Sequence, residues 1–159
     1  MESQQMNKPV IFSAIVIAWM ATPAAAAPIC DVGNGGLGLP AGFCALVVAD
    51  NLGPARKAVT AANGDLYVTL QEGPNQTGGV VALRDADNDG KFEIIEKFGA
   101  GAGTGIALHN GYLYVAQPYQ TIRWKMTPGT LLPTGPMEVV VTGFDRVGGH
   151  RDKGVTFDD

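Results

Sequence analysis

A phrase of eleven residues recurs in this chain, and its spacing limits the folds that the chain can adopt. Residues 58–68 read AVTAANGDLYV, and residues 105–115 read GIALHNGYLYV. A third copy, GVTFDD, begins at Gly154. Gly64 and Gly111 lie 47 residues apart, and Gly105 and Gly154 lie 49 apart. A repeat of this length, built from short alternating runs and tight turns, is typical of β-propellers with one four-stranded blade per repeat.

The rest of the pattern agrees with an all-β chain. Alternating apolar residues predict strands at 43–49, 57–61, 65–70, 79–84, 91–98, 104–108, 112–116, 121–126, 137–142 and 153–157. Asn-Gly at 63–64 and 110–111 is a strong signal for a two-residue hairpin turn. The predicted fold class is an incomplete β-propeller, with about two blades and the start of a third. Because such rings take roughly four to eight blades, we expect the N-terminal part of a longer protein, with exposed sheet faces.

The first residues have the pattern of an export signal. Lys8 precedes an apolar stretch at 10–20, which leads into the alanine-rich segment 21–27. We interpret residues 1–26 as a signal peptide that is cleaved after Ala26, with an uncleaved membrane anchor as the alternative. The predicted domains are then this signal peptide, a glycine-rich segment at 27–42 and a truncated propeller domain at 43–159. The expected location is periplasmic or secreted, without stable membrane insertion after cleavage.

The two cysteines, Cys30 and Cys44, flank a glycine-rich stretch. In an oxidising compartment they are expected to form a structural disulfide. A disulfide that closes a loop of this size stabilises a fold by roughly 3 kcal/mol in the chain-entropy model. Neither cysteine belongs to a CxxC motif, so a redox motif or haem attachment is not indicated. The net charge of −4 argues against a nucleic-acid partner, which would require a basic face.

Two groups of residues are candidates for metal binding or catalysis. Asp85, Asp87 and Asp89 alternate in a glycine-containing turn and fit the calcium-loop pattern as far as its later glutamate, Glu96. Strand-like flanks would carry Glu96 roughly 20 Å away at about 3.3 Å per residue, so an EF-hand is excluded. The turn is then either a calcium site made by the three aspartates or a solvated acidic turn.

The two histidines occupy different places in the repeat. His109 lies beside Asn110-Gly111, so we expect a surface turn residue. His150 comes just before the predicted inner strand 153–157, at the end where propellers bind ligands. An imidazole there suits proton abstraction from an alcohol, although a lone histidine of this kind is more often structural.

Several motifs, in their order, resemble the start of glucose/sorbosone dehydrogenase family proteins. They are LPAGFC at 39–44, ARKAV at 55–59, NGDLYV at 63–68 and RDADNDGK at 84–91. This family consists of exported quinoproteins that use pyrroloquinoline quinone (PQQ). The resemblance covers residues 37–159 and implies a six-bladed parent with PQQ over its axis.

The resemblance also implies an activity, which is oxidation of a sugar hydroxyl or aldehyde hydrate by hydride transfer to the quinone. His150 occupies the position of the family's proton-accepting histidine. The implied partners are a sugar substrate and an electron acceptor, whereas the ligands of PQQ and of the catalytic calcium belong to blades beyond this sequence. The alternatives are a non-enzymatic exported propeller that binds or scaffolds, and an inactive fragment.

Overall fold

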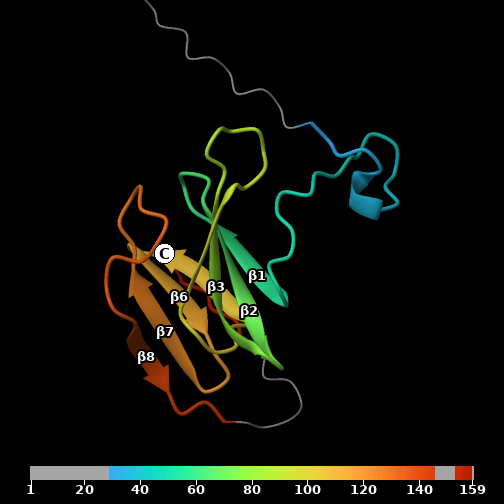
Figure 1. The fold of residues 1–159 in the computed structure, drawn as a ribbon. Helices are drawn as coiled ribbons and strands as arrows, with labels where there is room; N and C mark the ends of the chain where they lie inside the picture. The colour runs from blue at the N-terminus through green and yellow to red at the C-terminus, as the bar shows by residue number, and fades with distance from the viewer. Residues whose placement is uncertain (1–28, 146–152, 159) are drawn as a thin grey trace, which may run out of the picture.

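The computed structural model describes residues 29–145 and 153–158. This part of the chain forms two four-stranded antiparallel sheets that pack face to face, without an α-helix (Figure 1). The prediction of an all-β incomplete propeller is confirmed. No helix in these ranges is long and apolar enough to cross a membrane. The predicted signal peptide, residues 1–26, lies outside the described residues.

In each sheet the strands neighbour one another in chain order, which is the arrangement of a propeller blade. Blade 1 contains β1 (Ala55–Thr60), β2 (Leu66–Gly73), β3 (Gln76–Arg84) and β4 (Ile94–Phe98). Blade 2 contains β5 (Gly105–His109), β6 (Tyr112–Ala116), β7 (Gln120–Lys125) and β8 (Glu138–Thr142). A short 3-10 turn, η1 (Asn34–Gly36), precedes the blades.

The two copies of the repeated phrase each form a hairpin, but the two hairpins differ in register. Val59 pairs with Tyr67 across the first hairpin, and Ile106 pairs with Val115 across the second. The turn at Asn110-Gly111 has positive φ at both residues, 47° and 76°, as a tight primed turn requires. The first hairpin instead closes with the pair Thr60–Leu66 around residues 61–65, so the two-residue turn expected at Asn63-Gly64 is not formed. The repeat in the sequence therefore preserves the strands but not the turn.

The main core lies between the blades. Blade 1 contributes Tyr67, Val80 and Ala82, and blade 2 contributes apolar side chains of β6 and β7 that are equally buried. Trp124 of β7 meets Phe98 of β4 edge-on, with ring centroids 5.3 Å apart. Burial of these side chains is the main stabilising contact between the sheets. It is needed because each four-stranded sheet carries apolar residues on both faces.

The outer face of blade 1 differs from our expectation of an exposed sheet. Val81 and Leu83 are fully buried there, under a second cluster to which Ala49 and Leu52 of the preceding segment contribute. The chain before β1 thus crosses and covers this face. The outer strand β8 of blade 2 remains exposed, as expected of an edge.

Three strand predictions need correction. Residues 43–49 are not a strand, because their main chain bonds to Asp31 and Phe92 instead of a sheet edge. Residues 153–157 have no ladder partner in the described part and are not assigned as a strand. The strand predicted from Lys91 begins at Ile94, since the acidic turn extends to Glu93.

We expect Trp124→Ala to destabilise the protein by about 3–5 kcal/mol, the usual cost of deleting a buried aromatic side chain. The indole is 6% exposed and fills the core between the blades. Urea unfolding followed by circular dichroism measures the change. Val141→Ala, on the exposed strand β8, is the control and should change stability by less than about 1 kcal/mol. Equal effects of the two substitutions would contradict a core between the blades.

Candidate functional site

The first strand of each blade, β1 or β5, is its inner strand, and the direction of these strands distinguishes two ends of the molecule. β1 and β5 both run toward their Asn-Gly turns, and they contact one another. Residues 153–157 continue the series, since Lys153 lies against Thr104 at the start of β5 and Phe157 against His109 at its end. We call the end where these segments begin the entry end, and the end with the Asn-Gly turns the turn end.

At the entry end, a close contact fixes the third inner segment. The main-chain N–H of Lys153 donates to Oγ1 of Thr104 over 2.8 Å, and this hydroxyl donates to the Lys153 carbonyl over 3.4 Å. Gly105 allows the approach, because a Cβ there would collide with the main chain of residues 153–155. His150 lies outside the described residues, so the structure does not locate the candidate base.

His109 is not the exposed turn residue that we expected. It ends β5, is partly buried, and its ring stacks on Phe157 with centroids 4.1 Å apart and planes 4° apart. Tyr114 meets the same phenyl ring edge-on at 4.7 Å. His109 therefore helps to hold the third inner segment against blade 2.

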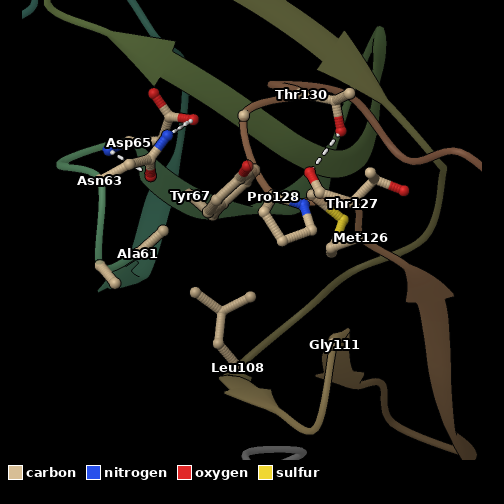
Figure 2. A pocket seen from close by; sticks show the side chains of 12 residues that line it. Ala61, Asn63, Asp65, Tyr67, Leu108, Gly111, Met126, Thr127, Pro128 and Thr130 are labelled. Atoms are coloured by element: carbon tan, nitrogen blue, oxygen red, sulfur yellow. Dashed lines mark hydrogen bonds between the residues drawn. The ribbon is translucent and has the colours of Figure 1, made fainter.

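The turn end contains a cavity of about 310 Å³ between the blades (Figure 2). Its walls are mainly apolar and come from both blades; Ala61 and Tyr67 belong to blade 1, and Leu108, Met126 and Pro128 to blade 2. Asn63, Asp65 and the loop after β7 form its polar border.

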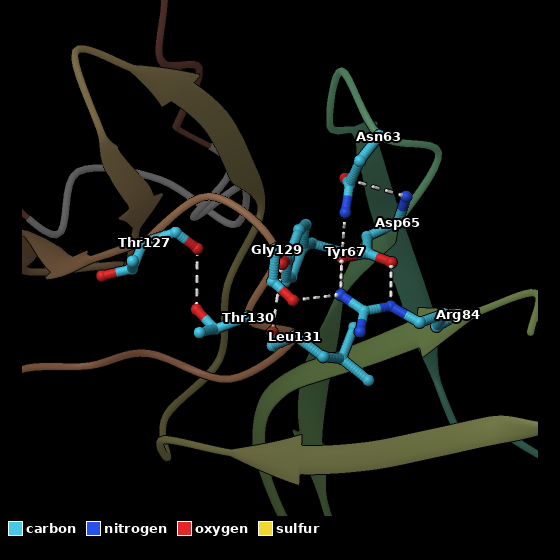
Figure 3. Close-up of polar contacts among 8 residues, drawn as sticks. All are labelled: Asn63, Asp65, Tyr67, Arg84, Thr127, Gly129, Thr130 and Leu131. Atoms are coloured by element: carbon cyan, nitrogen blue, oxygen red, sulfur yellow. Dashed lines mark hydrogen bonds and ion pairs between the residues drawn. The ribbon is translucent and has the colours of Figure 1, made fainter.

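An ion pair between the partly exposed Arg84 and the buried Asp65 lies at the border of this cavity (Figure 3). Arg84 donates through Nε and Nη2 to the two carboxylate oxygens of Asp65, over 2.7 and 2.6 Å. Nη2 also donates to the Gly129 carbonyl of blade 2 over 3.2 Å. Asp65 is 2% exposed, and Arg84 together with Asn63 lowers the pKa of its carboxyl. This bidentate pair joins the blades and leaves little free capacity for catalysis.

Tyr67 completes the contact between the blades at this end. Its hydroxyl donates to the Leu131 carbonyl over 3.0 Å, and burial raises its pKa. Leu66 pairs with Leu83, and this register places Asp65 next to Arg84. Aligning the two strands in the sequence would therefore have predicted the ion pair. The contacts to Gly129 and Leu131 could not be predicted, because no local sequence pattern indicates which loop will cover a blade.

The acidic turn between β3 and β4 is a compact group of carboxylates. Asp85, Asp87, Asp89 and Glu93 each offer an oxygen, and these oxygens all lie within 4.8 Å of one another. Asp85 accepts from the main-chain N–H groups of Asn88 and Gly90, over 2.6 and 2.9 Å.

The sequence prediction for this turn missed Glu93. The strand-like flank was expected to start at Lys91, but Glu93 folds back and accepts from the main-chain N–H of Ala86 over 2.9 Å. Glu96 pairs with Ala82 in the ladder, away from the turn. The same backbone bonds also suit a solvated acidic turn, so calcium binding stays a prediction.

Cys30 and Cys44 are joined by a disulfide, with their Cα atoms 5.8 Å apart. Next to it, Asp31 accepts from the main-chain N–H of Val47 over 2.7 Å and pairs with Lys91 over 3.2 Å. These two contacts lower the pKa of Asp31. The disulfide thus ties the N-terminal segment to the region of the acidic turn.

The turn-end cavity does not suit a polycarboxylate cofactor such as PQQ. Its lining residues include the carboxylate of Asp65 and no basic side chain, and the nearby guanidinium of Arg84 is already bound by Asp65. Two lysines stand instead toward the entry end: Lys57 lies near the start of β1, and Lys153 begins the third inner segment. The described residues at that end do not form a closed cofactor site.

Comparisons with known proteins agree with the fold. The described architecture is that of a partial β-propeller. It is similar to the holo form of the PQQ domain of pyranose dehydrogenase from Coprinopsis cinerea, with a TM-score of 0.55 and 18% sequence identity. The match covers 67% of this chain and 25% of that domain chain. No protein-family model and no curated protein matches the sequence.

We expect the stabilising effect of Asp65 to disappear in acid. Its pKa is lower in the folded state than its ordinary value of 3.8, so the stability it contributes is present above pH 3.8 and is lost as the pH falls through the folded pKa. Asp65→Asn should therefore lower the unfolding free energy at pH 7, and the difference from the parent should shrink below pH 3.8. Urea unfolding at a series of pH values measures it, and a pH-independent difference would contradict the ion-pair explanation.

The calcium prediction is tested by titrating the protein with CaCl₂ in a calorimeter. If the turn binds the ion, Asp87→Ala and Glu93→Gln should each weaken binding at least tenfold, because each removes a charged ligand from a group of four. Glu96→Gln, outside the group, is the matched control and should bind as the parent does. No heat of binding in the parent, at millimolar calcium, would identify a solvated acidic turn.

Proposed function

We propose that this chain is part of a PQQ-dependent sugar dehydrogenase, and that it contributes the first blades of the ring and the catalytic base. The observation that carries the proposal is the fold, which matches a PQQ domain over two thirds of the chain. The motifs that resemble the glucose/sorbosone dehydrogenase family support it independently, since they were recognised from sequence.

The distribution of charge between the two ends supports the entry end as the cofactor side. PQQ carries several carboxylates, which require donors and positive charge. Lys57 and Lys153 stand toward the entry end. The lining of the turn-end cavity, by contrast, includes the carboxylate of Asp65 and no basic side chain.

In the proposed reaction, His150 accepts the proton of a sugar hydroxyl or aldehyde hydrate. A neutral imidazole is suited to this step near neutral pH. A quinone cofactor supplies the two-electron acceptor for the hydride. Thr104 and Gly105 contribute indirectly, because they hold Lys153, three residues after His150, against the start of β5.

The test is His150→Ala in a protein that joins these residues to the remaining blades. We expect PQQ binding to be retained and sugar oxidation to fall by about two to four orders of magnitude, the usual contribution of a general base. Dye reduction with added PQQ and calcium measures turnover, and quenching of tryptophan fluorescence follows cofactor binding.

His109→Ala is the matched control, because this second histidine lies at the other end of its inner strand and packs on Phe157. It should keep most of the turnover. Unchanged turnover in His150→Ala would remove this residue from the mechanism. Absence of PQQ binding by the complete protein would instead favour the alternative, a non-enzymatic binding or scaffold propeller.

A further inference from the structure

The outer face of blade 1 is built to pack against a sheet. In blade 2, the cross-strand pairs Leu113–Trp124 and Val115–Ile122 form the face that packs on blade 1. The same repeat positions in blade 1 form the pairs Leu66–Leu83 and Val68–Val81. Both sets come from the second and third strands of their blades and have the same register, so they are equivalent surfaces.

An irregular segment, not a sheet, covers this surface in blade 1. Ala49 and Leu52 pack on it, and they belong to residues 45–53, which we call the cover segment. Phe92 of the acidic loop completes the contact. The coverage is effective, because Val81 and Leu83 are fully buried.

The cover segment is held by few main-chain contacts. It has no ladder with any strand of the described part, and its own valines, Val47 and Val48, are 42% and 37% exposed. The main-chain N–H of Phe92 donates to the Val48 carbonyl over 2.8 Å, and Nζ of Lys97 donates to the Leu52 carbonyl over 3.4 Å. A segment held this way opens more easily than the paired strands beneath it.

The Cys30–Cys44 disulfide provides a further anchor, next to the hydrogen bond that the main-chain N–H of Ala45 donates to Oδ1 of Asn34 over 3.2 Å. It keeps Asp31 beside the start of the cover segment, where Asp31 donates its main-chain N–H to the Ala45 carbonyl over 2.9 Å and its carboxylate accepts from Val47. The same carboxylate pairs with Lys91, adjacent to Phe92. The disulfide therefore links one end of the cover segment to the loop that holds its middle.

We propose that the cover segment is a detachable lid on the outer face of blade 1, and that the Cys30–Cys44 disulfide latches it. With the disulfide intact, the lid covers the apolar face. Reduction by a dithiol transfers two electrons and two protons to the cysteine pair, the dithiol becoming a cyclic disulfide. The lid then opens and exposes the apolar face without unfolding blade 2.

Methyl NMR with a soluble gadolinium chelate tests the lid on the whole chain. After dithiothreitol treatment, or in the Cys30→Ser/Cys44→Ser variant, the methyl groups of Val68, Val81 and Leu83 should show a severalfold larger relaxation enhancement. The methyl groups of Leu113 and Val115, in the equivalent face of blade 2, are the internal control and should stay shielded.

A second variant opens the lid without touching the cysteines. Leu52→Asp places a charge against the apolar face and should expose the same methyl groups with the disulfide intact. Leu37→Asp is its control, since Leu37 is 60% exposed and lies outside the cover segment. Shielded blade 1 methyl groups after reduction would overturn the latch, and equal exposure in both blades would show general loosening instead of a lid. Neither outcome depends on PQQ or on the proposed enzyme activity.

Discussion

The contact between the two blades is the interaction on which the rest of the structure depends. A four-stranded sheet with apolar residues on both faces cannot shield itself, so each blade needs a neighbour. Blade 2 meets that need for one face of blade 1 with Trp124, Ile122 and their neighbours in the core. Tyr67 and Arg84 then fix the relative position of the blades through hydrogen bonds to the loop after β7.

Close approach of the backbone is the second constraint, and it explains the glycines between the blades. Gly78 and Gly79 lie against the main chain of residues 98–102, and Gly99 lies under the ring of Trp124. Each has positive φ as well, so a side chain at these positions would be strained as well as crowded. The glycine-rich connection between the blades is thus a packing requirement of the entry end.

The sequence was sufficient to predict the repeated blades, but it did not predict which segments cover them. Alternation and the Asn-Gly turns predict the eight strands and their order, because strand formation within a blade depends on local period and turn chemistry. The strand predicted at residues 43–49 was wrong, because strand formation there does not depend on local sequence alone. An apolar alternating segment forms a strand only if an edge of suitable register is available, and its main chain instead bonds to Asp31 and Phe92. Glu93 was missed because the end of the acidic turn is set by its own hydrogen bond to Ala86.

The ion pair between Asp65 and Arg84 has a structural role, and this limits where catalysis can occur. Both oxygens of Asp65 accept from Arg84, and the arginine extends to Gly129 in the other blade. A carboxylate bound in this way is a weak base, because its protonation would break a buried pair. The cavity beside it therefore lacks a free base, a nucleophile or an unpaired cation among its described lining residues. Lys57 and the third inner segment lie toward the other end, where we propose that the cofactor binds.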